Sequence, residues 1–334
     1  MAEWQTRRPQ KPLLARVCGF ESHSGHAVTL DDVSTTITSH TLVVFPGQGS
    51  VAVASGDGWR HRPEWWIVEN VSSLTGVDVA HLLLTAPNEE VIRTDNAQLA
   101  TFTLSLMGWH AWRDHEEPPA AFAGHSLGEF SALVAAGVLS LEDGARLVAA
   151  RGRAMAQAAL AQPGTMVALM GPDETAMAAL ENEAHLYIAN VNGPGQIVVS
   201  GTVDAVADLL ERHKELGWRR ASALNVGGAF HSPLMASAQA SVDAALDDVT
   251  FGDTSALVGA NVDGHWYGGG AAWRERLSSQ LTSTVHFDRM IQAAPEHLER
   301  VVEMPPSGTL TGLIKRIRTF SQLEGFSPTS GANA

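Results

Sequence analysis

One serine of the chain stands in a setting that would make it a nucleophile. Ser126 lies in a Gly-x-Ser-x-Gly frame, with the small apolar run 120–123 before it and the helix-forming run 129–136 after it. This order of strand, sharp turn and helix is what a nucleophile elbow requires. The flanking glycines allow the tight turn, and backbone N–H groups at the helix N-terminus could stabilise an oxyanion. The frame alone also occurs by chance in glycine-rich turns.

Two further segments could complete such a site. Residues 41–50 form a β-type apolar run that ends in Pro46-Gly47 and continues into Gln48, which is typical of a buried parallel strand leading into a loop. Residues 225–235 place His231 in a glycine-rich loop, where an imidazole is free to point into a cleft. His231 is one of 14 histidines, so an ordinary loop residue is the alternative interpretation.

The elements that must position these residues follow from the hydrophobic periodicity. From residue 41 onward, apolar β-type runs alternate with helical patterns over 97–112, 129–138 and 141–160, which predicts a parallel sheet covered by helices. A different pattern follows: strand 165–170, helix 173–183, strands 186–190 and 196–200, helix 202–216 and strand 219–224. This βαββαβ order is typical of a ferredoxin-like unit.

We therefore predict an α/β fold with a large domain made of residues 41–161 and 225–320 and a small subdomain over 162–224. Residues 1–40 are polar and weakly periodic, so we expect an extension there, and residues 321–334 are expected to form a C-terminal tail. Ser126 belongs to the large domain and His231 follows the junction. The active site is therefore expected in the cleft between the two parts.

Composition limits the class of protein. With 334 residues, 45% hydrophobic and 17% charged, the chain can bury the core of a soluble globular enzyme. It has no run of 18 apolar residues, and a net charge of -14 argues against nucleic acid as a partner. Arg7-Arg8 lacks the apolar stretch of an export signal, and the single Cys18 favours the reducing cytoplasm. No metal site is expected, because His23 and His26 have no ligand cluster beside them.

Five motifs follow one another between residues 41 and 319: Phe45-Pro-Gly-Gln-Gly-Ser50, Gly124-His-Ser-Leu-Gly-Glu129, Arg151-Gly-Arg-Ala-Met155, Asn190-Val-Asn-Gly-Pro-Gly-Gln196 and Gly228-Ala-Phe-His-Ser232. Their order and spacing resemble the malonyl-CoA:acyl-carrier-protein transacylase family, which serves fatty acid and polyketide biosynthesis. The resemblance implies an α/β-hydrolase-like large domain with an inserted ferredoxin-like subdomain. It also implies transfer of a malonyl-type group from coenzyme A to the phosphopantetheine thiol of an acyl carrier protein, by a ping-pong route through an acyl-serine. No cofactor is implied beyond the coenzyme A thioester substrate and the arm that the partner carries.

The resemblance also implies roles for individual residues. Ser126 would be the nucleophile and His231 its base. In the family a backbone carbonyl orients the histidine, and the matching position here is Gln280. The backbone N–H groups of Gln48 and Leu127 would bind the oxyanion.

Arg151 bears on the class of substrate. It lies 25 residues after Ser126, where the family places an arginine that holds the free carboxylate of a malonyl group. A guanidinium offers a planar, charged, bidentate match to a carboxylate. The alternative is a surface arginine, or one that pairs with Glu142 or Asp143. Phe230 matches a position where a bulky ring leaves little room for an α-branch, favouring malonyl over methylmalonyl.

Other residues match family positions around the site. Those expected to line or support the substrate site are His125, Gln98, Asn190 and Asn192. For the two asparagines, a turn-forming role is the alternative. The basic residues offered for carrier docking are Lys214, Arg219, Arg220, Lys315 and Arg316, each of which could instead be a solvated surface charge.

Three alternative functions remain open on the sequence. The first is a discrete acyltransferase that loads an unusual acyl group or moves it from carrier to carrier. The second is a serine esterase or thioesterase-type editing hydrolase, which would need an acid between Ser126 and its histidine in chain order and gives no reason for Arg151. The third is a non-catalytic docking module, against which the intact Ser126, His231 and Arg151 speak.

Overall fold

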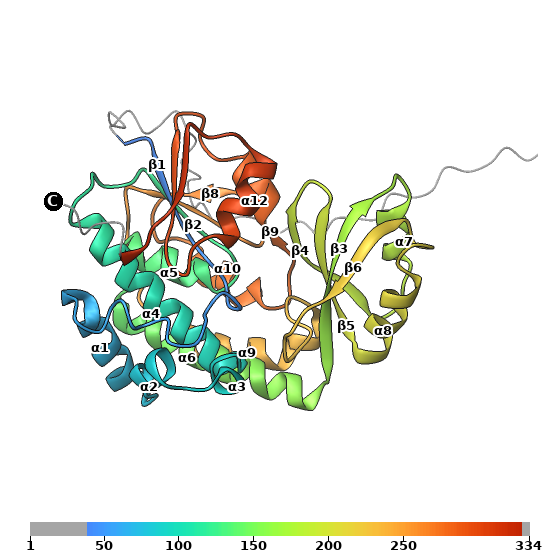
Figure 1. Cartoon of the computed structure of the whole chain (residues 1–334), viewed down its shortest axis with the longest axis horizontal. Helices are drawn as coiled ribbons and strands as arrows, with labels where there is room; N and C mark the ends of the chain where they lie inside the picture. Colours follow the sequence, from blue (N-terminus) through green and yellow to red (C-terminus); the bar gives the residue numbers. More distant parts are fainter. Residues whose placement is uncertain (1–38, 329–334) are drawn as a thin grey trace, which may run out of the picture. The chain divides into compact units, whose positions relative to one another are not determined.

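The computed structural model describes residues 39–328 (Figure 1). The expected extension over 1–40 therefore lies almost wholly outside the described residues, as do Cys18, His23 and His26. None of the helices formed by residues 39–328 combines the length and the apolar character needed to cross a bilayer.

The larger of two sheets has the strand order β11-β10-β1-β2-β7-β8. Its strands are β1 (Thr41–Phe45), β2 (Ala121–Gly124), β7 (Leu257–Gly259), β8 (Trp266–Tyr267), β10 (Arg300–Glu303) and β11 (Gln322–Gly325). All neighbouring pairs are parallel except β7 and β8, which are antiparallel. The strand β11 forms an edge of this sheet, although its residues were expected in a tail.

Helices cover both faces of the larger sheet. On one side lie α1 (Trp66–Thr75), α2 (Val79–Leu84), α4 (Thr94–Arg113), α5 (Gly128–Ala135), α6 (Leu141–Ala161), α9 (Ala236–Leu246) and α10 (Trp273–Gln280), with the short α3 (Asn88–Val91) beside α2 and α4. On the other side lie α11 (Phe287–Gln292) and α12 (Thr309–Ile317). Short 3-10 helices occupy Pro63–Trp65 and Pro233–Met235.

The sequence of β1 shows that this strand is buried on both faces of the sheet. Val43 and Phe45 pack into the core shared with α4, α5 and α6, whereas Leu42 and Val44 pack into the core shared with α11 and α12. Because successive side chains of a strand point to opposite faces, a strand buried on both faces must be apolar throughout. The continuous run Leu-Val-Val-Phe is the result.

The smaller sheet has the order β6-β3-β5-β4-β9. Its strands are β3 (Gly164–Pro172), β4 (Leu186–Gly193), β5 (Gln196–Thr202), β6 (Trp218–Ala223) and β9 (Val285–His286), and its helices are α7 (Ala176–Glu181) and α8 (Val203–Arg212). Figure 1 shows α7 and α8 on one side of these strands, where Val167, Val199 and Leu209 form a separate core. On the opposite face Met166, Ala168 and Val198 belong to the core shared with α4, α5 and α6, which also contains Phe230.

The predicted βαββαβ order is present, with two differences. The first helix begins only at Ala176, because the Asp173 side chain accepts hydrogen bonds from the backbone N–H and the hydroxyl of Thr175 and holds a turn there. The second difference is the strand β9, which comes from outside residues 162–224 and pairs in parallel with β4. Segment boundaries at 161 and 225 therefore do not coincide with the limits of the smaller sheet.

Candidate active site

The nucleophile turn joins β2 to α5. Ser126 has a φ of 53°, in the left-handed region that residues with a side chain rarely occupy. The surrounding backbone is packed so closely that a Cβ on Gly124 would lie 1.9 Å from the carbonyl carbon of Gly128, and a Cβ on Gly128 would lie 2.0 Å from the Phe45 oxygen. The Gly-x-Ser-x-Gly frame is therefore required by packing between β1, β2 and α5.

Ser126 and His231 lie in hydrogen-bond contact. The Ser126 Oγ is 2.7 Å from His231 Nε2, and His231 Nδ1 is 2.9 Å from the Gln280 carbonyl oxygen. Because a carbonyl can only accept, the Nδ1 atom carries the ring proton and Nε2 is free to accept from the serine hydroxyl. Burial, with a smaller contribution from the Arg151 charge, lowers the pKa of His231 to about 3, so the ring is neutral near pH 7.

Hydrogen bonds from serine hydroxyls hold the loop that carries His231 in place. His231 itself has a φ of 55°. The Ser200 hydroxyl donates to the Phe230 carbonyl, and the Ser232 hydroxyl donates to the Ala229 carbonyl at 2.6 Å. These bonds on both sides of the histidine hold its backbone in a conformation that is otherwise unfavourable.

The two expected oxyanion donors are available. Among the hydrogen bonds between described residues, none uses the backbone N–H of Gln48 or Leu127. The N–H of Ser126 itself is occupied, since it donates to Asn261 Oδ1 at 2.6 Å. A carbonyl oxygen that arrived at Ser126 could therefore be met by the two free groups.

Arg151 extends from α6 into the site and is fully buried. Its Nη1 donates to Gln98 Oε1 at 2.6 Å, and its Nη2 donates to Ser126 Oγ at 3.1 Å and to Gln280 Oε1 at 2.9 Å. Its Nε has no acceptor among the described residues. Burial lowers the pKa of Arg151, and the nearby Glu129 partly opposes this.

The arginine has no carboxylate in direct contact within residues 39–328. Of the two acids considered from the sequence, Glu142 pairs with Arg146 at 2.7 Å, and Asp143 bonds to Ser140 at the start of α6. The surface alternative for Arg151 is therefore wrong. A buried guanidinium whose hydrogen-bond partners are all neutral can bind an anion.

Sequence reasoning missed two buried side chains behind the nucleophile turn, Glu129 and Asn261. The Glu129 carboxylate accepts from the Asn261 backbone N–H at 2.8 Å and from the Gln280 amide. Burial raises the pKa of Glu129 to about 7, although those bonds and Arg151 oppose it. Glu129 ends the recognisable Gly-His-Ser-Leu-Gly-Glu motif, but nothing local marks Asn261, which is 135 residues from Ser126.

Of the other expected substrate-side residues, His125, Asn192 and Gln98 are linked to this centre by hydrogen bonds. His125 Nε2 lies 2.8 Å from Asn192 Oδ1, which connects the nucleophile turn to β4. The Gln98 amide donates to the Gln48 side chain at 2.6 Å, so Gln98 connects the loop that follows β1 to Arg151. Asn190 and Phe230 are both buried, on β4 and directly before His231 respectively.

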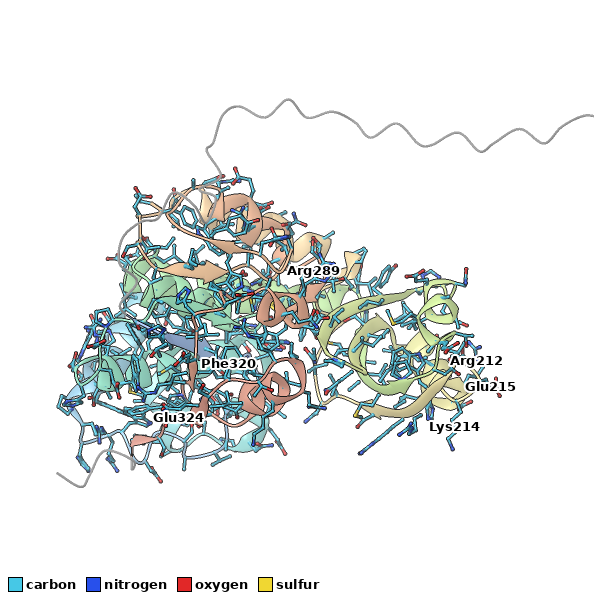
Figure 2. The ribbon with its side chains drawn as sticks, turned by 90° about the horizontal axis from the view of Figure 1, so that it is seen from above. Arg212, Lys214, Glu215, Arg289, Phe320 and Glu324 are labelled. Carbon is cyan, nitrogen blue, oxygen red and sulfur yellow. The ribbon has the colours of Figure 1, made fainter. Side chains whose placement is uncertain are left out.

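The five basic residues proposed for carrier docking are not brought together. Arg219 and Arg220 lie on β6, with Lys214 just before that strand, whereas Lys315 and Arg316 lie on α12, which packs against β4. The strands β3 and β5 separate β6 from β4. Figure 2 shows Lys214 beside Arg212 and Glu215, and Arg212 is itself paired with Glu183 at 2.8 Å.

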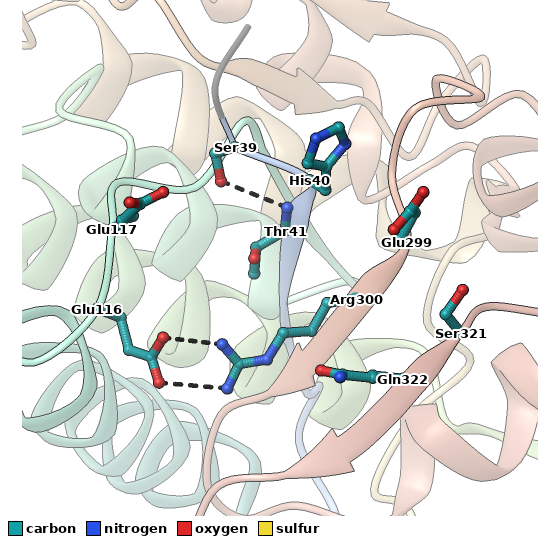
Figure 3. A pocket seen from close by; sticks show the side chains of 9 residues that line it. All are labelled: Ser39, His40, Thr41, Glu116, Glu117, Glu299, Arg300, Ser321 and Gln322. Carbon is teal, nitrogen blue, oxygen red and sulfur yellow. Dashed lines mark hydrogen bonds and ion pairs between the residues drawn. The ribbon is translucent and has the colours of Figure 1, made fainter.

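Two cavities lie away from the dyad. One of about 300 Å³ lies at the beginnings of β1, β10 and β11, where Figure 3 shows Arg300 paired with Glu116. The other, about 280 Å³, is lined mainly by apolar residues including Trp59, Pro305 and Phe326. Within the described part of the chain, no three His, Cys, Asp or Glu side chains are grouped to hold a metal ion.

The chain is similar to known proteins over most of its length. The acyl transferase domain family matches residues 60–329. A malonyl CoA-acyl carrier protein transacylase of Bacillus subtilis is 34% identical over 287 residues, which are 84% of this chain and 90% of the relative. The crystal structure of the Mycobacterium tuberculosis MCAT aligns with a TM-score of 0.80 at 33% identity, covering 85% of this chain and 95% of that one. A malonyl-transacylase solved with its type II PKS acyl-carrier protein also aligns with a TM-score of 0.80, at 32% identity, covering 86% of this chain and 96% of that one.

Proposed function

The chain belongs to the malonyl-CoA:acyl-carrier-protein transacylase family of acyl transferases, and from this premise we propose that it transfers a malonyl group from coenzyme A to the phosphopantetheine thiol of an acyl carrier protein. The observation that carries the substrate assignment is the buried Arg151, whose guanidinium contacts Ser126 Oγ and has no carboxylate partner among the described residues. A malonyl group brings a free carboxylate, whereas an acetyl or simple fatty acyl group does not. The carboxylate would satisfy the unpaired Nε donor and neutralise the buried charge.

The reaction proceeds in two half-reactions. His231 Nε2 takes the hydroxyl proton as Ser126 Oγ attacks the thioester carbonyl, and the N–H groups of Gln48 and Leu127 bind the oxyanion. When the C–S bond breaks, the imidazolium returns the proton to the coenzyme A sulfur, and malonyl-Ser126 remains. The carrier thiol then gives its proton to His231 and attacks the ester, so that Ser126 is released with its hydroxyl restored.

We also assign supporting roles to the residues around the dyad. Gln280 orients His231 through its carbonyl, while Gln98 and the Gln280 amide hold the guanidinium before substrate arrives. The Phe230 ring restricts room for an α-methyl group and so favours malonyl over methylmalonyl. His125, Asn190 and Asn192 support the substrate side. The thioester substrate and the single cysteine are best suited to the cytoplasm, where we propose that the enzyme works.

The hydrogen-bond partner of His231 Nδ1 argues against the hydrolase alternative. An esterase triad places a carboxylate at the Nδ1 atom, and here a main-chain carbonyl occupies that position. The dyad geometry alone does not distinguish transfer from hydrolysis, so the fate of the acyl group must be measured.

The decisive experiment is intact-protein mass spectrometry after brief incubation with malonyl-, methylmalonyl-, ethylmalonyl-, acetyl- and longer acyl-CoAs. We expect rapid malonyl labelling that is absent in Ser126→Ala and strongly reduced in Arg151→Ala, because the latter removes the carboxylate contact. Addition of a holo-acyl carrier protein should then discharge the malonyl group onto the carrier.

Arg153→Ala is the matched control, because Arg153 lies two residues from Arg151 on the same helix but is exposed. It should label like the wild type. Equal labelling by acetyl- and malonyl-CoA, insensitive to Arg151→Ala, would overturn the dicarboxylate assignment. Discharge to free malonate that the carrier does not accelerate would favour the hydrolase.

A further inference from the structure

The nucleophile turn is held from behind by one side chain of a different segment. Asn261 follows β7 and is fully buried. Its Oδ1 accepts from the Ser126 N–H at 2.6 Å, and its Nδ2 donates to the Gly124 carbonyl at 2.7 Å. One amide therefore bridges two positions of the turn.

The asparagine is itself fixed on its backbone. Its N–H donates to Glu129 Oε1 at 2.8 Å, and its carbonyl accepts from the His286 N–H at 2.8 Å. Glu129 also accepts from the Gln280 amide, which donates to the Ser126 carbonyl at 3.0 Å as well. Both backbone groups of Ser126 are thus bonded to groups that this network holds in place.

Such support answers a specific need. A residue with a side chain is unfavourable at the φ of Ser126, and it persists there only when its surroundings fix it. Because the Ser126 N–H already donates to Asn261, it cannot donate to an oxyanion, and the N–H groups of Leu127 and Gln48 remain for that role. It touches neither the Oγ atom nor His231 in the described hydrogen bonds.

We propose that Asn261 is a positioning residue, which holds the Ser126 turn in its left-handed conformation and so sets the aim of Oγ between His231 and the oxyanion donors. The proposal rests on Ser126 being the nucleophile of the proposed function. Since a misplacement of about 1 Å can reduce a rate about 100-fold, loss of the clamp should lower serine reactivity without weakening the carboxylate contact at Arg151.

The test measures serine reactivity in two ways. Phenylmethylsulfonyl fluoride requires the serine and its base but no carboxylate contact, whereas malonyl-CoA requires both. For Asn261→Ala we expect sulfonylation and single-turnover malonylation to fall about 100-fold per folded molecule, with the KM for malonyl-CoA unchanged. Asn96→Ala is the matched control, because it also loses an amide-to-carbonyl bond, of 2.8 Å to Glu90, and its side chain takes part in none of the described hydrogen bonds of the site.

Asn261→Asp supplies a readout that simple loss of packing would not give. A protonated carboxyl can accept from the Ser126 N–H and donate to the Gly124 carbonyl as the amide does, whereas the ionised form cannot donate. The sulfonylation rate of this variant, divided by that of the wild type, should therefore rise as the pH is lowered. This variant carries the test if Asn261→Ala does not fold.

Opposite results are readily recognised. If Asn261→Ala reacts at the wild-type rate per folded molecule, or if the Asn261→Asp ratio does not change with pH, the positioning role is wrong. The proposed function fails separately, if the wild type reacts with the sulfonyl fluoride but never with malonyl-CoA.

Discussion

At the scale of the residue, Ser126 and His231 share an uncommon feature. Both occupy the left-handed region of φ, and both are held there by hydrogen bonds to their own or adjacent backbone groups. Their side chains therefore meet at 2.7 Å without relying on an acidic third member. The unfavourable backbone conformation of these two residues is therefore stabilised by hydrogen bonds with the buried polar groups around them.

His231 should make the fold sensitive to acid. Its folded pKa is lowered to about 3 from the ordinary 6.5, so between these values the unfolded chain binds a proton that the folded chain does not. The stability is therefore full above pH 6.5 and is lost as the pH falls towards 3, by up to about 1.4 kcal/mol per pH unit. Urea unfolding of the wild type and of His231→Gln between pH 7 and 4 measures this difference.

The expected result is that the His231→Gln curve falls less steeply on the acid side. Other histidines with a lowered pKa, such as the partly buried His110 with a pKa of about 4, titrate in both proteins and cancel in the comparison. Parallel curves would show that the His231 pKa is not depressed in the folded protein.

The sequence could predict the residues of the site that belong to local motifs. Ser126, His231 and Arg151 stand in such patterns, and the structure brings all three together. Asn261 could not be found in this way, because its partners Ser126 and Gly124 lie 135 and 137 residues away. Likewise the sequence singled out the carbonyl of Gln280, whereas its side chain also contacts Arg151.

At the scale of the element, the start of α12 is organised by one buried acid. The Glu303 carboxylate accepts from the backbone N–H groups of Gly308, Leu310 and Thr311 at 2.8–2.9 Å. Free N–H groups at a helix N-terminus need acceptors, and a negative charge there is favoured. Strand β10 thereby fixes the helix that follows it.

Glu303→Ala should destabilise the protein by about 3 kcal/mol, because it leaves the buried N–H of Leu310 and two partly buried N–H donors without their charged acceptor. Urea unfolding at pH 7 measures the change. Glu324→Ala is the control on the neighbouring strand: its pair with Arg300 is half-exposed, so its loss should change stability by less than about 1 kcal/mol. Equal effects of the two substitutions would contradict the capping role.

The order of elements was largely predictable from periodicity, and their ends were not. The six elements predicted over residues 162–224 appear in the expected order. The first of its helices is shorter than expected because the Asp173 side chain bonds to Thr175, and such competition leaves only a weak trace in an apolar pattern. The two-residue strand β9 is too short to have a period at all.

At the scale of the whole molecule, carrier docking must overcome a net charge of -14. Of the two basic groups, Lys315 and Arg316 belong to α12, a helix that packs against β4, the strand of Asn190 and Asn192. Arg219 and Arg220 lie on the edge strand β6, which β3 and β5 separate from β4. We therefore expect the α12 pair to guide the carrier to the site.

Lys315→Glu with Arg316→Glu should raise the KM for the carrier about tenfold, and leave the KM for malonyl-CoA unchanged, because each reversed surface charge contributes less than about 1 kcal/mol. The effect should shrink at high salt. Arg219→Glu with Arg220→Glu is the matched pair and should have little effect. The opposite ranking would place the docking surface on β6.

The strand β9 also bears on how this enzyme could be recombined with its relatives. A chimera that exchanges residues 162–224 alone would bring a foreign β4 against the resident Val285 and His286, and the bond from the Thr284 hydroxyl to the main-chain carbonyl of residue 188 would have to form again across the junction. Any graft intended to change acyl or carrier preference should therefore include the donor's matching β9 as a second, non-contiguous insert. A single continuous exchange that carried both pieces would also carry His231, which lies between them in the chain.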